Sequence, residues 1–222
     1  MSTQTRTNRP FLTWLEILII IFGLGAMLVI GGLGAAGLLT LSQSFAATAA
    51  QSFWFISRSS GVLAYLLLTL SVLWGLVQSG AILRPLIPPA LALGLHNFLS
   101  WSALVMAGLH AVVLLGDGYI NMGLLSLLVP FTAPVQPFWV GLGVIALYLS
   151  LLLSLSFYVR KHIGQKNFRA FHYLTYLAYI LVTLHGLGSG TDSLSLLVLY
   201  AISAGAVINL TFWRTAKALL KK

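Results

Sequence analysis

The chain contains no cysteine, and only three of its 222 residues are acidic. The absence of cysteine excludes disulfides, zinc–thiolate centres, iron–sulfur clusters and thiol redox chemistry. The acidic residues Glu16, Asp117 and Asp192 are too few for a membrane proton relay built on carboxylates. Charged residues make up 7% of the chain, whereas hydrophobic residues make up 59%. A soluble domain of this length could not bury so much apolar surface, so the composition predicts an integral membrane protein.

The net charge of +9 suggests nucleic-acid binding only if the placement of the basic residues is ignored. Most of them lie in short segments beside apolar runs, where Lys and Arg set the orientation of membrane helices. Both termini are then expected in the cytoplasm, and only Arg58 of the twelve basic residues falls near the outer face. We therefore expect a multi-pass protein of the plasma or inner membrane, an all-α bundle of six transmembrane helices with no nucleic-acid partner. The expected spans are about 11–40, 53–79, 89–116, 138–159, 168–188 and 193–213.

The segments outside the spans are short. Residues 1–10 predict a cytoplasmic tail, residues 11–213 the transmembrane domain and residues 214–222 a basic cytoplasmic tail. The first apolar run is far longer than the 7–15 apolar residues of a signal peptide, which favours an uncleaved helix. In the longest connection, the apolar stretch 122–129 is too short to span a bilayer and predicts an interfacial segment or lid.

Four histidines lie within the apolar helices: His96 and His110 in the third, and His172 and His185 in the fifth. Separations of fourteen and thirteen residues correspond to about 21 and 20 Å along the helix axes, or two levels in a hydrocarbon core of about 30 Å. Both helices are expected to run outward. Depth therefore pairs His96 with His172 near the cytoplasm (the inner pair) and His110 with His185 near the outside (the outer pair). Such pairs suit two stacked haems, each iron being held from both sides.

The spacing in the fifth helix leaves one question open. Fourteen residues place two side chains about 40° apart around an ideal helix, whereas thirteen place them about 140° apart. Either the fifth helix is locally distorted, or the two haems approach it from different sides.

Other roles for the four histidines carry less weight. Hydrogen bonding between helices is the simplest alternative, but two depth-matched pairs of ionisable residues in an apolar setting favour a functional role. A compact zinc or copper site cannot be built from ligands about 20 Å apart on one helix. A channel or transporter remains an alternative, because intramembrane polar residues also mark permeation paths.

Two histidine spacings, H-x13-H followed by H-x12-H, occur together with RSSGVLAYLLLTLSVLWGL in the second span and HGLGSGTDS after the last histidine. In these motifs, over roughly residues 53–190, the chain resembles the ferric reductase-like transmembrane domain family. That family includes the membrane cores of NADPH oxidases and iron reductases, and the haem-binding subunit of a bacterial methionine sulfoxide reductase system. The resemblance implies a six-helix bundle that holds two non-covalent b-type haems on the four histidines and passes electrons across the membrane.

Three features depart from the oxidase branch of this family. The chain ends about ten residues after the sixth span, and no GxGxxG or P-loop motif supplies the flavin and nicotinamide domains. Leu114 stands where those oxidases tend to carry another histidine. Ala178 stands where an aromatic residue often lies between the haems, with Tyr176 and Tyr179 as neighbours. The first two departures disfavour a dedicated superoxide-producing enzyme.

We therefore expect a membrane cytochrome b that relays electrons from a cytoplasmic flavin or quinol donor to an extracytoplasmic acceptor. The irons would do the redox chemistry, while FAD or FMN would be carried by a separate partner flavoprotein. The chain would then be a component of an oxidoreductase. The alternative is the haem-binding subunit of a complex dedicated to one extracytoplasmic reductase.

Two arginines complete the expected cofactor site. The family often places an arginine in the RxSG context of Arg58 beside the outer haem, where it would hold a propionate; snorkelling to the surface is the alternative. Arg169 lies three residues before His172 in a basic segment. It could enforce topology only, or also dock an acidic donor or hold the propionates of the inner haem.

Overall fold

The structure is a computed structural model that describes residues 49–80, 87–117, 120–190 and 195–220. Within these ranges the chain is helical and contains no β-strand. Five helices are long and apolar enough to cross a membrane, which supports a multi-pass membrane protein; they cover Ser52–Ser79, Pro89–Gly116, Pro137–Ile163, Gln165–Ser189 and Leu197–Leu219. These are the second to sixth expected spans. The expected first span, 11–40, and the tail, 1–10, lie outside the described residues.

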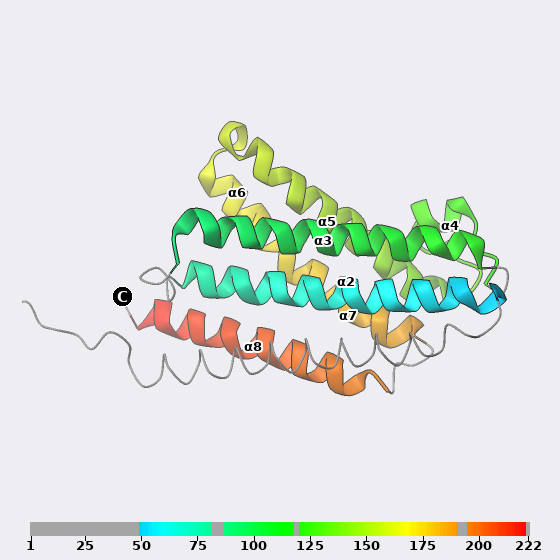
Figure 1. Ribbon diagram of the computed structural model, residues 1–222. Coiled ribbons are helices and arrows are strands. Elements are labelled where there is room, and N and C mark those ends of the chain that lie inside the picture. The colour runs from blue at the N-terminus through cyan, green and yellow to red at the C-terminus, as the bar shows by residue number, and fades with distance from the viewer. Residues whose placement is uncertain (1–48, 81–86, 118–119, 191–194, 221–222) are drawn as a thin grey trace, which may run out of the picture.

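The first two described helices run antiparallel to each other (Figure 1). Helix α2 covers Ala49–Ser79, and α3 covers Pro89–Val113 before it tightens into the 3₁₀ turn η2, Leu114–Gly116. Proline is tolerated at the start of α3 because the first backbone N–H groups of a helix have no intrahelical acceptor. The Trp74 indole N–H of α2 donates to the Ala92 carbonyl of α3 at 2.8 Å, which ties the two helices together near their loop.

A short helix, α4 at Leu124–Leu128, precedes the long helix α5 at Pro137–Ile163. Helix α4 is only five residues long and its leucines are largely exposed, so the expected short segment occurs in the structure. The Tyr148 hydroxyl of α5 donates to the Leu128 carbonyl at 2.5 Å and fastens α4 to the bundle.

The expected fifth span is divided into two helices, α6 at Gln165–His172 and α7 at Leu174–Ser189. Gly164 makes the tight turn from α5 into α6 with a φ of 81°. A residue with a side chain would adopt this positive φ only with strain. At the break, the Tyr176 N–H donates to the Tyr173 carbonyl three residues earlier, and the Thr175 hydroxyl donates to the His172 carbonyl at 2.6 Å. The hydroxyl thereby satisfies a carbonyl at the interruption.

The last helix, α8, covers Leu197–Leu219 and extends beyond the expected end of the sixth span at residue 213. Arg214 and Lys217 of the expected basic tail are therefore helical. Six of the seven described Lys and Arg residues lie at one end of the bundle, where α5 turns into α6 and α8 ends (Figure 1); they are Arg160, Lys161, Lys166, Arg169, Arg214 and Lys217. Arg58 lies toward the opposite end. This asymmetry agrees with the expected topology.

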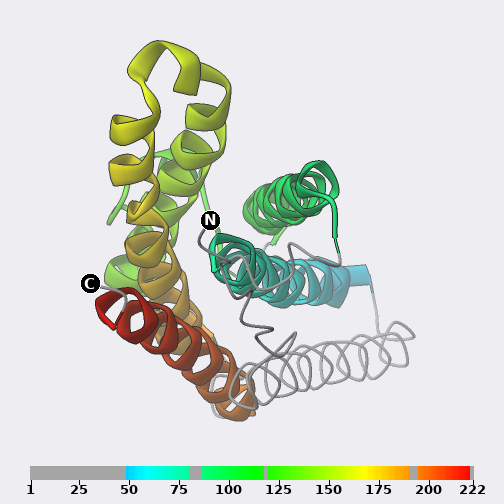
Figure 2. The ribbon, with the colours of Figure 1, turned by 90° about the vertical axis from the view of Figure 1, so that its left-hand side faces the viewer.

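The helices form two closely packed pairs. Helix α2 packs along α3, and α5 packs along α7, whereas contacts between the two pairs are sparse. The end-on view separates α2 and α3 from the group of α5, α6 and α7, with α8 against α2 and α7 (Figure 2).

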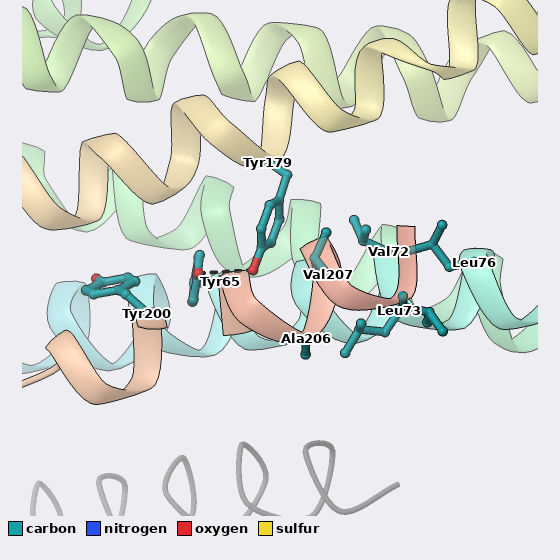
Figure 3. Packing of buried hydrophobic residues seen from close by; sticks show 9 residues of the cluster. Tyr65, Val72, Leu73, Leu76, Tyr179, Tyr200, Ala206 and Val207 are labelled. Carbon is teal, nitrogen blue, oxygen red and sulfur yellow. Dashed lines mark hydrogen bonds between the residues drawn. The ribbon is translucent and has the colours of Figure 1, made fainter. Parts of the chain in front are cut away.

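The densest core lies where α2, α7 and α8 meet (Figure 3). The hydroxyls of Tyr65 and Tyr179 lie 3.1 Å apart, and the Thr69 hydroxyl lies 3.2 Å from that of Tyr179. Thr69 also donates to the Tyr65 carbonyl at 2.8 Å. The buried hydroxyls are thus paired with one another inside an apolar cluster, and the tyrosine pair joins α2 to α7.

The outward surface of α3 is apolar. Leu91, Phe98, Val105 and Val112 recur every seven residues and are 64%, 66%, 61% and 61% exposed. A ridge of large aliphatic and aromatic side chains facing water would promote aggregation, whereas the same ridge is stable against lipid tails. The surface therefore agrees with a lipid bilayer environment.

The tyrosine pair predicts how the α2–α7 junction responds to mutation. Tyr179→Phe removes a hydroxyl that lies near two others, so we expect the bundle to lose about 0.5–1 kcal/mol of stability, the usual size of a polar contact between membrane helices. Unfolding of the purified protein in mixed micelles would measure the loss. Tyr158→Phe makes the same chemical change at an exposed position of α5 and should be neutral. Equal losses in the two variants would contradict the role of the tyrosine pair.

Candidate functional site

The structure brings the four histidines together in two pairs. The ring centres of His96 and His172 are 6.1 Å apart, as are those of His110 and His185. The ring planes are inclined by 76° in the inner pair and 73° in the outer pair. In each pair, α3 supplies one histidine, while α6 or α7 supplies the other. The pairs are those that the expected depths predict.

A cavity of about 880 Å³ lies between the helices and is lined by all four histidines. It extends from Arg58 and Ser189, near the outer pair, to Arg169 and Arg214, near the inner pair. This volume is large for a small-molecule site, since such sites usually measure about 300–1,000 Å³. The two histidine levels therefore belong to one continuous site.

Backbone carbonyls of α2 hold the two histidines of α3. The Nδ1 atom of His110 lies 2.8 Å from the Ser57 carbonyl oxygen, and that of His96 lies 3.1 Å from the Ser71 carbonyl oxygen. A carbonyl only accepts hydrogen bonds, so Nδ1 carries the proton and donates it. The Nε2 atom of each neutral ring then keeps its lone pair, which is the tautomer that binds a metal through Nε2.

Glycines of α2 make this approach possible. A β-carbon at Gly61 would lie 2.9 Å from His110 Nδ1, and one at Gly75 would lie 3.2 Å from His96 Cε1. Each glycine stands four residues after the serine whose carbonyl holds the same histidine. A Ser-x3-Gly unit thus occurs twice in α2, fourteen residues apart, which matches the spacing of the histidines on α3. The sequence-based site did not include this repeat, although both spacings are visible in SRSSGVLAYLLLTLSVLWG, residues 57–75.

Helix α5 holds His185 in the same way. Its Nδ1 atom lies 2.9 Å from the Trp139 carbonyl oxygen, and a β-carbon at Gly143 would lie 2.7 Å from that nitrogen. Gly143 again stands four residues after the residue whose carbonyl accepts from the histidine. Three of the four histidines are therefore held by the same arrangement. A helix carbonyl accepts a hydrogen bond from Nδ1, and a glycine one turn later makes room for the ring.

His172 is held differently. It is the last residue of α6, next to the break at Tyr173. Its Nδ1 atom is buried and has no hydrogen-bond partner among the residues that the structure describes. Its ring stacks on that of Phe168, with centres 5.4 Å apart and planes inclined by 23°. The thirteen-residue spacing coincides with a local irregularity at Tyr173, whose backbone stays helical, and both histidines of the fifth span lie beside histidines of α3.

The two predicted arginines lie at opposite ends of the cavity. The Arg58 guanidinium lies beside Gly190, where a β-carbon would come within 3.1 Å of Nη1. Arg169 is exposed and lines the cavity near the inner pair. Arg160 and Arg214 line the same end, although the sequence assigned them only to topology. Arg214 comes from α8, so only the fold could bring it to this site.

The positions at which the sequence departs from the oxidase branch also line the cavity. Leu114 and Ala178 both contribute to the wall, and Ala178 is 1% exposed. Tyr176 lines the cavity, whereas Tyr179 belongs to the core with Tyr65. The wall between the two histidine levels is therefore aliphatic at position 178.

Each histidine pair offers two protein ligands. Across the described part of the chain, no group of three or more His, Cys, Asp or Glu residues could hold a metal ion. Structural and catalytic zinc sites use three or four such ligands. A metal shared by one of these pairs would need most of its remaining ligands from a non-protein group.

Comparisons of this chain with protein-family models, curated proteins and solved structures found no match. The resemblance to the ferric reductase-like family therefore stays a prediction from the quoted motifs. The function has to be inferred from the chain's own residues, above all from the two histidine pairs that line one cavity.

Proposed function

We propose that the chain is a membrane cytochrome b in which two non-covalent haems b relay electrons across the bilayer. His96 and His172 would hold the inner haem, and His110 and His185 the outer haem. The observation that carries this proposal is the 6.1 Å spacing within both pairs. A metal–imidazole bond is about 2 Å long and the ring centre lies about 1 Å further on, so one iron between two rings separates their centres by about 6 Å.

The tautomers of the histidines also support a haem site. His96, His110 and His185 each donate from Nδ1 to a carbonyl, which leaves Nε2 as the metal-binding nitrogen. Each pair supplies two ligands and no more, which is what a metal already bound by four macrocycle nitrogens requires. A non-haem centre would find too few protein ligands at both levels among the residues that the structure describes.

The lining of the cavity also suits haem b. Its middle is largely apolar, as a porphyrin face requires, and its two ends carry guanidinium groups. Arg58 at the outer end would pair with propionates there, and Arg169 with Arg160 and Arg214 would do so at the inner end. These residues fit a flat apolar cofactor with carboxylates on its edge.

When bound, each haem supplies one-electron chemistry at its iron. The chain's own residues fix the two levels, since His96 and His110 lie about 21 Å apart along α3. Haems at these two levels would carry electrons through most of an apolar layer of about 30 Å. The basic end would receive electrons from an acidic flavoprotein that carries FAD or FMN, or from quinol, and the Arg58 end would pass them to an acceptor. The chain would then be the electron-carrying component of a reductase.

The first test of this proposal is cofactor stoichiometry. We expect two haems b per chain, both low-spin because both axial positions are filled. His110→Ala and His185→Ala should each lose the outer haem, which lowers the haem content to about one per chain. His96→Ala and His172→Ala should each lose the inner haem, with the same result. Pyridine haemochrome assay against protein concentration measures the ratio. His162→Ala changes an exposed histidine and should leave it at two. Colourless protein, or full haem in all four variants, would refute the proposal.

A second prediction concerns the glycines that make room for the histidines. Gly61→Ala puts a methyl group 2.9 Å from His110 Nδ1 and should separate this ring from the Ser57 carbonyl. Loss of such a partner costs about 10- to 100-fold in metal affinity, so apomyoglobin should extract one haem from this variant much faster than from wild type. Gly108→Ala adds the same methyl group to α3 in open space and should behave as wild type. Equally slow loss of haem from the two variants would contradict the proposed role of Gly61.

A third prediction concerns Arg58. A positively charged guanidinium beside the outer haem favours its reduced form. Arg58→Ala should therefore keep both haems and lower the reduction potential of the outer haem by tens of millivolts. For one electron, about 60 mV corresponds to about 1.4 kcal/mol. Arg58→Lys should recover part of the shift, because lysine keeps the charge and loses the bidentate fork. Redox titration measures both potentials, with Lys161→Ala at the other end as the control. An unmoved outer potential would reduce Arg58 to an interfacial anchor.

A further inference from the structure

The four histidines differ in how their second nitrogen is satisfied. His96, His110 and His185 each place Nδ1 within 3.1 Å of a helix carbonyl oxygen. His172 has no such partner among the described residues, although its Nδ1 atom is buried. The outer pair is therefore anchored on both sides, whereas the inner pair is anchored on the side of α3 only.

The element that carries His172 is also the weakest part of the site. Helix α6 has eight residues and lies between the turn at Gly164 and the break at Tyr173. Five of those eight residues are exposed, so little apolar packing holds the helix in place. By contrast, His185 lies within α7, which packs along α5. Stacking on Phe168 is the contact that orients the His172 ring, and Phe168 belongs to the same short helix.

The missing hydrogen bond has a chemical consequence. A partner on the second nitrogen fixes the ring orientation and raises the basicity of the ligating nitrogen, and its loss typically costs about 10- to 100-fold in metal affinity. We infer that His172 is the one exchangeable ligand of the four, so that a small neutral ligand of reduced iron, of the class of carbon monoxide, binds at the inner haem in its place. The inference rests on the proposed cytochrome function.

The exchange itself is a simple substitution. The bond that His172 Nε2 would make to the iron would break, a bond to the carbon of carbon monoxide would replace it, and no electron or proton would be transferred. The freed ring can move with α6, whose outer surface is exposed. His96 stays bound on the opposite side, because the Ser71 carbonyl continues to hold it. At the outer level, the carbonyls of Ser57 and Trp139 hold both ligands and keep the iron closed.

The test is a carbon monoxide titration of the dithionite-reduced full chain, followed by its difference spectrum in the Soret region. We expect saturation at one carbon monoxide per two haems. Binding to neither haem would overturn the inference, as would equal binding to both. Pyridine haemochrome assay on the same sample separates this outcome from failure of the proposed function, because two low-spin haems that refuse carbon monoxide would contradict the inference alone.

Paired histidine variants assign the site. The variant His110→Ala/His185→Ala keeps the inner level only, and its remaining haem should bind carbon monoxide. The variant His96→Ala/His172→Ala keeps the outer level only, and its remaining haem should not. Each variant removes both ligands of one level, so no five-coordinate haem is left to bind carbon monoxide spuriously. The reverse result would place the exchangeable ligand in the outer pair and overturn the inference.

Gly143→Ala provides a second test in the intact protein. Its methyl group would lie 2.7 Å from His185 Nδ1 and should displace this ring from the Trp139 carbonyl. The outer level then has a ligand without its carbonyl partner, and the Ser189 hydroxyl, 3.3 Å from His185 Nδ1, is its remaining contact. The fraction of retained haem that binds carbon monoxide should rise above one half, whereas Gly108→Ala should leave it at one half. No difference between these variants would show that the carbonyl contact does not control exchange.

Discussion

The candidate site depends on one contact, in which a histidine Nδ1–H donates to a helix carbonyl that a neighbouring glycine exposes. A helix carbonyl already accepts from the residue four positions later, and a glycine at that later position leaves room for an imidazole ring to approach the same carbonyl. Gly61, Gly75 and Gly143 provide such openings. The contact orients the ring, fixes its tautomer and brings two helices close together. Packing and ligand chemistry are thus determined by the same residues.

This contact explains why the bundle divides into two pairs of helices. The histidines of α3 bind carbonyls of α2, and His185 of α7 binds a carbonyl of α5, so each hydrogen bond lies within a pair. The imidazole nitrogens that remain are directed between the pairs, where the cavity lies. A bundle whose pairs packed tightly against each other would close that space. The core of α2, α7 and α8 and the contacts between α3 and α5 hold the pairs together, and the cavity lies between them.

Hydropathy and helix rise predicted much of this arrangement. Five of the expected spans coincide with helices because an apolar run of sufficient length has few alternatives in a membrane. The pairing of His96 with His172 followed from depth alone, since axial position is linear in residue number. The angular position of His172 did not follow, because it depends on a break at Tyr173 that no proline or glycine marks. Arg214 was missed for a related reason, since a helix from the end of the chain reaches the inner pair only through tertiary packing.

The break at Tyr173 places the two levels under different constraints. Along an unbroken helix, thirteen residues would turn His172 away from the partner of His185 by about 140°. In the structure both rings lie beside histidines of α3, and His172, the last residue of α6, has no hydrogen-bond partner for its Nδ1 atom among the described residues. The His172 ring thus lies beside α3 without a backbone contact for its Nδ1 atom among the described residues, at the level that Arg160, Arg169 and Arg214 line. The inner level is therefore the adaptable one, and the outer level, with both rings held by backbone, sets the fixed geometry of the site.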